Sequence, residues 1–168
     1  MRNHHVATCV TAAALGASAL ALLAPAAQAR EPVTFTPFTI PANRCGFPID
    51  VGVVANSEYQ DVVTLADGTT VTRIRGRLVL SFTNAATGSS IVRNVSGPTT
   101  ETDHPDGTGT FVGEGLNWFA FGPVSQANTG EPGLVFTSGL VVLQFAGGAV
   151  ADFSLDGEQT NGCELLGG

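Results

Sequence analysis

The sequence is short of charge, above all of positive charge, and this shortage excludes several functions at the outset. Its 168 residues hold 7 Lys+Arg against 14 Asp+Glu, and charged residues make up only 12% of the chain. Lysine is absent after residue 29, which excludes a Schiff-base enzyme, a Walker-type phosphate loop and a Ser–Lys dyad. The net charge of −7 argues against nucleic acid as a partner, because nucleic-acid binding needs a basic surface.

Long apolar runs are also missing beyond the N-terminal segment, so we expect no membrane span in the remaining chain. Hydrophobic residues nevertheless make up 43% of the sequence, which is too many for a disordered acidic tail. The length is that of one domain. We therefore expect a single folded domain over residues 30–168.

The first 29 residues have the three parts of an export signal. Arg2 and two histidines precede an alanine-rich apolar stretch over residues 10–24. Ala27 and Ala29 then form the A-x-A pattern that signal peptidase reads. We predict a signal peptide over 1–29, cleaved after Ala29, and an extracellular location for the rest. A retained membrane anchor is the alternative, which so short an apolar stretch does not favour.

Cysteine is scarce, and its placement predicts a disulfide. Cys9 lies in the segment that cleavage would remove, which leaves Cys45 and Cys163 near the two ends of the exported chain. Two cysteines in an oxidising compartment are expected to pair. The alternative is a redox-active or catalytic thiol, but no Cys-x-x-Cys motif and no neighbouring histidine support it.

Short runs of β-branched and aromatic residues, separated by Gly, Asp-Gly and Asn/Pro clusters, recur along the rest of the chain. No segment shows the 3.6-residue period of an amphipathic helix, and the pattern is typical of antiparallel sheet. The expected strands are Val33–Ile40, Ile49–Ala55, Tyr59–Leu65, Thr69–Thr83, Ser89–Val95, Thr99–Asp103, Gly109–Gly113, Leu116–Phe121, Leu134–Phe145 and Ala149–Leu155. The sequence predicts an all-β fold, an antiparallel meander of about eight to ten strands that closes into a small barrel or a rolled sandwich. We expect residues 122–132, rich in Gly, Pro and Asn, to form a loop.

Several turn and cap residues form a pattern that covers nearly the whole chain after residue 44. It comprises Cys45-Gly-Phe47-Pro48, Asp67-Gly68, Phe82-Thr83-Asn84 with Thr87-Gly88, Asn94 with Gly97, Asp106-Gly107, Gly115-Leu116-Asn117 and Cys163-Glu164-Leu165. In these elements the chain resembles a group of uncharacterised small secreted β-proteins of high-GC Gram-positive bacteria, the actinobacteria. The resemblance implies a secreted β-fold and carries over no catalytic residue.

Candidates for catalysis or metal binding are few. His104 is the only histidine after residue 29 and stands beside Asp103 and Pro105-Asp106-Gly107, where two carboxylates could tune a general base. No Gly-x-Ser-x-Gly elbow supplies a nucleophile, and Pro-Asp-Gly is ordinary turn chemistry. The ligand spacing of a calcium loop is absent, and one histidine with two paired cysteines makes a poor transition-metal site. We expect no cofactor and no metal.

Three arginines are the first candidate for ligand binding. Arg73, Arg75 and Arg77 alternate along the expected strand 69–83, so strand geometry places them on one face. We expect this row to face solvent and to be compensated by cross-strand carboxylates. The candidate carboxylates are Glu101, Asp103 and Glu114. An anionic ligand is the alternative partner of the row.

Trp118 is the second candidate. It lies in Asn117-Trp118-Phe119-Ala120-Phe121, where one face could form an exposed apolar platform that stacks on sugar rings or docks a partner. The competing interpretation is that Trp118 fills the core, since the chain has few other large side chains.

Taken together, these patterns favour a secreted, non-enzymatic module that binds a small molecule, a glycan or a cell-surface component. The alternative is a small β-barrel enzyme, an isomerase or hydrolase that uses buried carboxylates. An enclosed lumen that held Glu114 and Asp152 would favour the enzyme, whereas a filled interior would favour the module.

Overall fold

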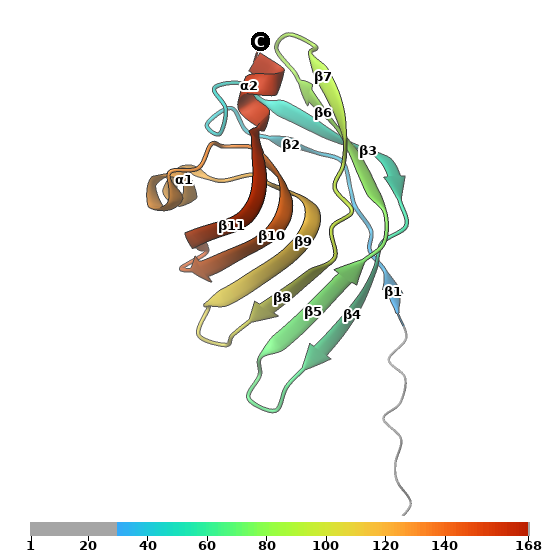
Figure 1. Ribbon diagram of the computed structural model, residues 1–168, viewed down its shortest axis with the longest axis vertical. Coiled ribbons are helices and arrows are strands. Elements are labelled where there is room, and N and C mark those ends of the chain that lie inside the picture. Colours follow the sequence, from blue (N-terminus) through green and yellow to red (C-terminus); the bar gives the residue numbers. More distant parts are fainter. Residues whose placement is uncertain (1–29, 168) are drawn as a thin grey trace, which may run out of the picture.

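The computed structural model describes residues 30–167, which fold into eleven strands and two short helices (Figure 1). The predicted signal peptide, 1–29, lies outside the described residues. The strands are β1 Glu31–Pro32, β2 Phe38–Ile40, β3 Ile49–Asn56, β4 Tyr59–Thr64, β5 Thr70–Arg75, β6 Leu78–Asn84, β7 Ser90–Asn94, β8 Thr99–Asp103, β9 Gly109–Phe119, β10 Val135–Ala146 and β11 Ala149–Asn161. The helices are α1 Pro123–Thr129 and α2 Gly162–Gly167. Among the described residues, neither helix is long enough to cross a bilayer.

The strands form two antiparallel sheets. A seven-stranded sheet has the order β1-β4-β5-β8-β9-β10-β11, and a four-stranded sheet has the order β2-β3-β6-β7. The all-β prediction is confirmed. The barrel version of that prediction is not what forms, because over residues 30–167 the strands divide between two sheets and no closed barrel is found.

Besides residues 33–37, which lead from β1 to β2, three short connections join the two sheets. The connections are residues 57–58 between β3 and β4, 76–77 between β5 and β6, and 95–98 between β7 and β8. Strand pairing continues across the connections. On the small-sheet side Asn56 of β3 faces Leu78 of β6, and on the large-sheet side Tyr59 of β4 faces Arg75 of β5. The expected single strand 69–83 is therefore two strands, bent at Gly76, whose φ of 128° suits glycine.

A second bend crosses the large sheet in a row of glycines. Gly115 on β9, Gly139 on β10 and Gly157 on β11 are direct cross-strand neighbours, and all three have positive φ. At Gly139 a Cβ atom would lie 2.2 Å from the carbonyl oxygen of Asp156. The absence of side chains here allows three long neighbouring strands to coil together, as the curved ribbons of Figure 1 show.

Two apolar clusters make up the interior. The larger cluster packs β10 and α2 against the small sheet, and its fully buried members include Ile49, Leu80, Phe82 and Leu134. The smaller cluster contains Phe121, Val135, Leu143 and Val150, with Phe111, Phe119, Phe145 and Phe153 partly buried around it. Because Val135 and Phe136 are both buried and belong to different clusters, β10 has core on both faces near its start.

Residues 122–132, expected to be a loop, contain helix α1. Gly122 is the N-cap residue, Pro123 occupies the first turn, and Gly130 ends the helix in a left-handed conformation with φ 76°. Proline at a helix start and glycine just beyond its end are standard helix signals. Seven residues are too few for a recognisable apolar period, so the sequence pattern alone indicated only a loop.

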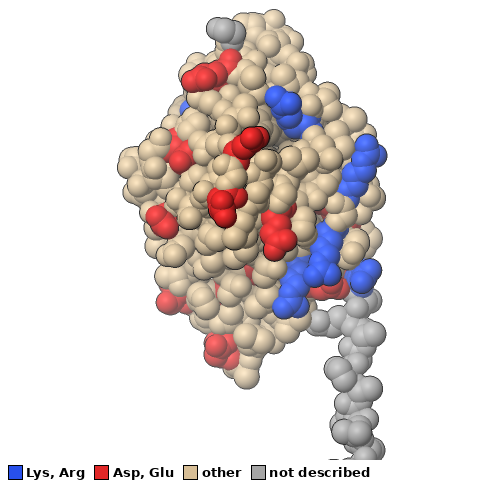
Figure 2. All heavy atoms as spheres, in the orientation of Figure 1, with Lys and Arg blue, Asp and Glu red and all other residues tan. Residues whose placement is uncertain are grey.

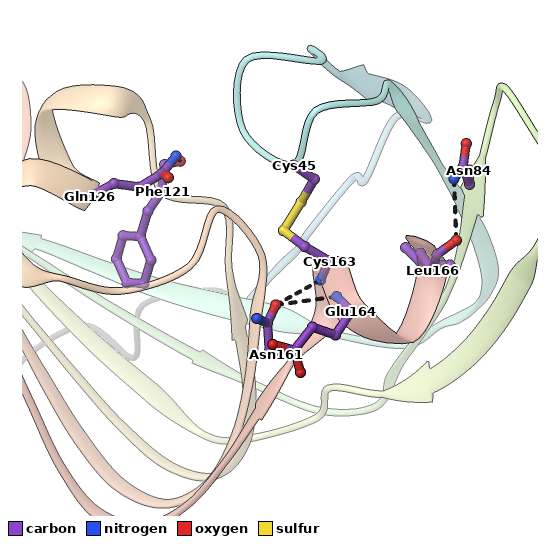
Figure 3. The surroundings of a disulfide bond; sticks show 8 residues. All are labelled: Cys45, Asn84, Phe121, Gln126, Asn161, Cys163, Glu164 and Leu166. Carbon is purple, nitrogen blue, oxygen red and sulfur yellow. Dashed lines mark hydrogen bonds between the residues drawn. A yellow bond between two sulfur atoms is a disulfide. The ribbon is translucent and has the colours of Figure 1, made fainter. Parts of the chain in front are cut away.

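The predicted disulfide between Cys45 and Cys163 is confirmed, with the two Cα atoms 5.2 Å apart. It ties the loop before β3 to the first turn of α2 (Figure 3). The side chain of Asn161 accepts hydrogen bonds from the backbone N–H groups of Cys163 and Glu164. At the far end of α2, Asn84 donates to the Leu166 carbonyl, so α2 is fixed at both ends.

Candidate functional site

Two arginines of the predicted row lie side by side on one face of the large sheet. Arg73 and Arg75 are both on β5 and both are exposed. Across the strand pair, Arg75 faces Tyr59 and Arg73 faces Asp61. Directly opposed residues share a face, so these four side chains project from the same side of the β4–β5 pair.

The other two arginines of this region come from irregular chain. Arg77 follows the bend at Gly76 and is exposed, and its carbonyl oxygen accepts a hydrogen bond from the Ser57 N–H. Arg30, just before β1, places its guanidinium 4.7 Å from the centre of the Tyr59 ring, a cation–π contact. We call Arg30, Arg73, Arg75 and Arg77, with Tyr59, the arginine cluster.

The carboxylates expected to compensate the row do not do so. Glu101 is paired with Thr72 and Asp103 with Thr70. Because neighbouring strand residues point to opposite faces, both acids lie on the other face of the sheet from Arg73 and Arg75. No arginine forms an ion pair with a carboxylate within the chain from residue 30 to residue 167. The three arginines face solvent, as expected. The expectation that Glu101 and Asp103 would compensate them is wrong, because both acids lie on the opposite face.

Glu114 is the one predicted acid that shares the face of the row. It follows Val112 by two residues, and Val112 pairs with Thr100, which pairs with Arg73. Arg75 and Glu114 both line a hollow of about 260 Å³ with Thr99, Thr100 and other residues. The two side chains make no ion pair, so the hollow presents separate basic and acidic walls to solvent.

Charge is divided across the molecule (Figure 2). Basic side chains gather on the side where Figure 1 shows β4, β5 and β7, while acidic side chains are spread over β9, β10, β11 and the hairpin tips. The described residues hold 6 arginines and 14 carboxylates, a net charge of 6 − 14 = −8. Four of those six arginines belong to the arginine cluster, so the little positive charge of the chain is concentrated at one place.

Trp118 lies in a different environment. Its ring centre is 5.3 Å from that of Phe82 in the core and within 6.5 Å of Phe35 and Phe38. Trp118 is partly buried and packs against the larger apolar cluster, while Phe38 is 42% exposed. The indole therefore joins the core to an aromatic rim and is not a free platform. The hollow that Trp118 lines, together with Phe35, Ile74 and other residues, includes none of Arg73, Arg75 and Arg77.

His104 joins two hairpin tips. Its backbone closes the turn before Thr108, and its Nδ1 atom lies 3.3 Å from the hydroxyl oxygen of Thr69 in the neighbouring turn. Hydrogen bonds from Thr69 lower the pKa of Asp67, and hydrogen bonds from Thr108 lower the pKa of Asp106. Both acids thus act as ionised turn caps, which matches the turn interpretation of Pro105-Asp106-Gly107.

The carboxylates that would have marked an enzymatic lumen are separated. Glu114 on β9 and Asp152 on β11 are both exposed, and β10 lies between their strands. Glu114 faces Leu140, whereas Asp152 faces Gln144, so the two acids are also displaced along the strands. Within residues 30–167 no group of three or more His, Cys, Asp or Glu side chains could hold a metal ion.

Sequence reasoning missed two members of the arginine cluster. Tyr59 is the only tyrosine of the chain, and Arg30 directly follows the predicted cleavage site. Their contact depends on the pairing of β1 with β4, in which Pro32 faces Tyr59. The alternation of charge around Arg73 and Arg75 was visible in the sequence, but a two-residue strand such as β1 gives no periodic signal.

No protein-family model, no curated protein and no solved structure matches this chain.

Proposed function

We propose that this protein is a secreted, non-enzymatic module that binds an anionic cell-surface polymer, an acidic glycan or a phosphate-bearing chain, through the arginine cluster. The observation that carries the proposal is that Arg73 and Arg75 share one face of β5 with Arg30 stacked on the neighbouring Tyr59, and that none of these arginines forms an ion pair within residues 30–167. Like charges repel when they lie side by side. A polyanion would remove that repulsion and would gain bidentate hydrogen bonds from the guanidinium groups.

The predicted export signal supports the same proposal. Cleavage after Ala29 would make Arg30 the first residue and would place a new α-amino group directly before β1, the strand that pairs with β4. This group would add a further positive charge to the cluster in the exported form only. The disulfide between Cys45 and Cys163 is compatible with an oxidising, extracellular location.

The exposure of the cluster sets the expected strength of binding. Arg30, Arg73, Arg75 and Arg77 are all exposed, and exposed charge pairs contribute no more than about 1 kcal/mol each. Useful affinity must then come from several contacts to one repeating chain. Binding should weaken steeply with salt, because exposed charges are screened over roughly 10 Å at 0.1 M ionic strength.

The test compares three polymers on the chain from residue 30 onward. Alginate supplies carboxylates, long-chain polyphosphate supplies phosphates, and dextran is the neutral control. We expect saturable binding of at least one anionic polymer in low salt, measured by biolayer interferometry. Raising the sodium chloride concentration to about 0.5 M should abolish it, and dextran should not bind.

Two variants of equal net charge locate the site. Changing Arg73, Arg75 and Arg77 together to Gln should weaken binding at least about tenfold. The control variant changes Gln144, Ser154 and Thr160 to Glu; all three are exposed on β10 and β11. It lowers the net charge by the same amount and should weaken polymer binding less. Equal losses in the two variants, or dextran binding as strong as alginate binding, would reject the proposal.

A further inference from the structure

A cavity of about 430 Å³ opens between α1 and the β10–β11 hairpin, away from the arginine cluster. Loop 41–47 supplies Arg44, the start of α1 supplies Pro123, Val124 and Ser125, and the hairpin supplies Phe145 and Val150. The volume is within the usual range for small-molecule sites. Its lining contains no acidic side chain and a single charged group, the guanidinium of Arg44.

Arg44 has few protein partners for a half-buried cation. One Nη1–H donates to the Ala120 carbonyl at 2.6 Å, while the buried Nε–H has no hydrogen-bond partner. No carboxylate between residues 30 and 167 forms an ion pair with it. A guanidinium carries five N–H donors, and a cation withdrawn from water without a counter-charge is costly. Among residues 30–167, then, no group balances the charge of Arg44.

The position of Arg44 is fixed by the surrounding backbone. Cys45, the next residue, is bonded to Cys163, which anchors the loop to α2 (Figure 3). Behind the loop, a Cβ atom on Gly133 would lie 2.0 Å from the Arg44 carbonyl oxygen, so only glycine permits this approach. Gly122 similarly leaves room for the guanidinium, 3.1 Å from where its Cβ would be. The charged group is held in place before any ligand arrives, which lowers the entropic cost of binding.

A second donor lies on the wall of the cavity. Ser125 is 7% exposed, and its hydroxyl oxygen accepts a hydrogen bond from the Val150 N–H at 3.0 Å. The hydroxyl proton is thus left to donate elsewhere. The remaining walls, which include Phe121, Phe145 and Val150, are apolar.

From this arrangement we propose that the cavity binds a small carboxylate with an apolar body, of the kind represented by a medium-chain fatty acid. The carboxylate pairs with Arg44 and the hydrocarbon lies along the apolar walls. This ligand is small and monoanionic, and the site is independent of the arginine cluster.

Decanoate, with decanol as its uncharged counterpart, tests the proposal by titration calorimetry on the chain from residue 30 onward. We expect saturable binding of decanoate and an affinity for decanol that is at least about tenfold lower, because a charge-assisted bond is lost. Absence of saturable decanoate binding, or equal affinity for the two, would overturn the assignment.

Three variants connect the binding to Arg44. Arg44→Gln removes the cation and should weaken decanoate binding at least about tenfold. Val124 is 64% exposed at the rim, so Val124→Asp should leave the fold intact while it supplies Arg44 with a competing carboxylate. Val124→Asp should therefore also weaken decanoate binding about tenfold, whereas the neutral, nearly isosteric Val124→Asn should change it less than about threefold. Equal effects of Asp and Asn at this position would contradict the proposal even if Arg44→Gln failed to fold.

The two proposed sites can fail separately. The variant with Arg73, Arg75 and Arg77 changed to Gln should bind decanoate as the unchanged protein does. Arg44→Gln should in turn bind alginate and polyphosphate as before. Loss of decanoate binding in the triple variant would show that the small carboxylate binds at the arginine cluster instead, and would overturn the assignment to this cavity.

Discussion

Trp118 connects the buried core to the solvent-exposed aromatic rim. Its edge-to-face contact with Phe82 and its contacts with Phe35 and Phe38 place it where two sheets meet. Aromatic pairs of this geometry stabilise a fold beyond the area they bury. The residue is therefore expected to matter for stability more than for binding.

Replacing Trp118 by Ala should lower the free energy of unfolding by about 2–4 kcal/mol, slightly below the range for a fully buried aromatic because the indole is partly exposed. Urea denaturation followed by circular dichroism measures the change. Phe38→Ala is the matched control, since Phe38 is 42% exposed, and should cost about 1 kcal/mol. A Trp118→Ala effect below about 0.5 kcal/mol would contradict a core role.

Glu101 makes the protein's stability depend on pH. Burial, and secondarily the charge of Asp103, raise the pKa of Glu101 above its ordinary 4.5. A carboxyl with a raised pKa in the folded state stabilises the fold when protonated, below about pH 4.5, and loses that contribution as the pH rises through the folded-state value. The ionised side chain is thus a cost to stability at neutral pH.

Glu101→Gln should consequently be more stable than the unchanged protein at pH 7, and the difference should shrink toward zero as the pH is lowered below about 4. Thermal unfolding between pH 3.5 and 7.5 gives the comparison. Glu158→Gln, on the exposed part of β11, serves as the control and should show no such gain at pH 7. A destabilised Glu101→Gln at neutral pH would argue against the stated cause.

Gly115, Gly139 and Gly157 shape whole strands, because as cross-strand neighbours they bend β9, β10 and β11 together. Its members differ in their surroundings. At Gly139 a Cβ would meet the Asp156 carbonyl at 2.2 Å, whereas at Gly115 nothing lies within 4 Å. Both have positive φ, so an alanine at either position is strained.

Gly139→Ala should lower stability by about 2–4 kcal/mol, because backbone strain and a close contact with backbone act together. Gly115→Ala introduces backbone strain without a close contact, so it should lower stability by only about 1–2 kcal/mol. Chemical denaturation of the two single variants separates these contributions. Equal costs would mean that strand β11 moves freely away from β10 at this point.

At the scale of the whole molecule, the disulfide joins two segments 118 residues apart in the chain, Cys45 and Cys163. Changing Cys45 and Cys163 together to Ala should lower the free energy of unfolding by about 3–5 kcal/mol, the range for a long closed loop. The far-UV circular dichroism spectrum should stay that of a β protein, since a domain of this size has a sufficient core. Two free thiols in an Ellman titration of the unchanged, secreted protein would refute the bond.

The fold class could be predicted from sequence because its signals are local. The β-branched runs identified strands, and Asp67-Gly68 and Asp106-Gly107 identified turns, because the geometry of strands and turns depends on neighbouring residues. The pairing of Cys45 with Cys163 followed from their number and compartment. Helix α1 was missed because seven residues cannot establish a period.

The candidate sites depended on contacts between distant parts of the chain, which strand periodicity does not encode. The bend at Gly76 divided one expected strand between two sheets, and the register of β5 with β8 put Glu101 and Asp103 on the face opposite Arg73. The pairing of β1 with β4 brought Arg30 onto Tyr59. The close approach of Gly133 to the Arg44 backbone placed a charged side chain in the cavity between α1 and the β10–β11 hairpin. The sequence by itself determined strands, turns and the disulfide, because these follow from local backbone preference and cysteine chemistry. Only the tertiary structure decided which charges meet, because a side chain's neighbours are set by cross-strand register and by the path of the chain between sheets.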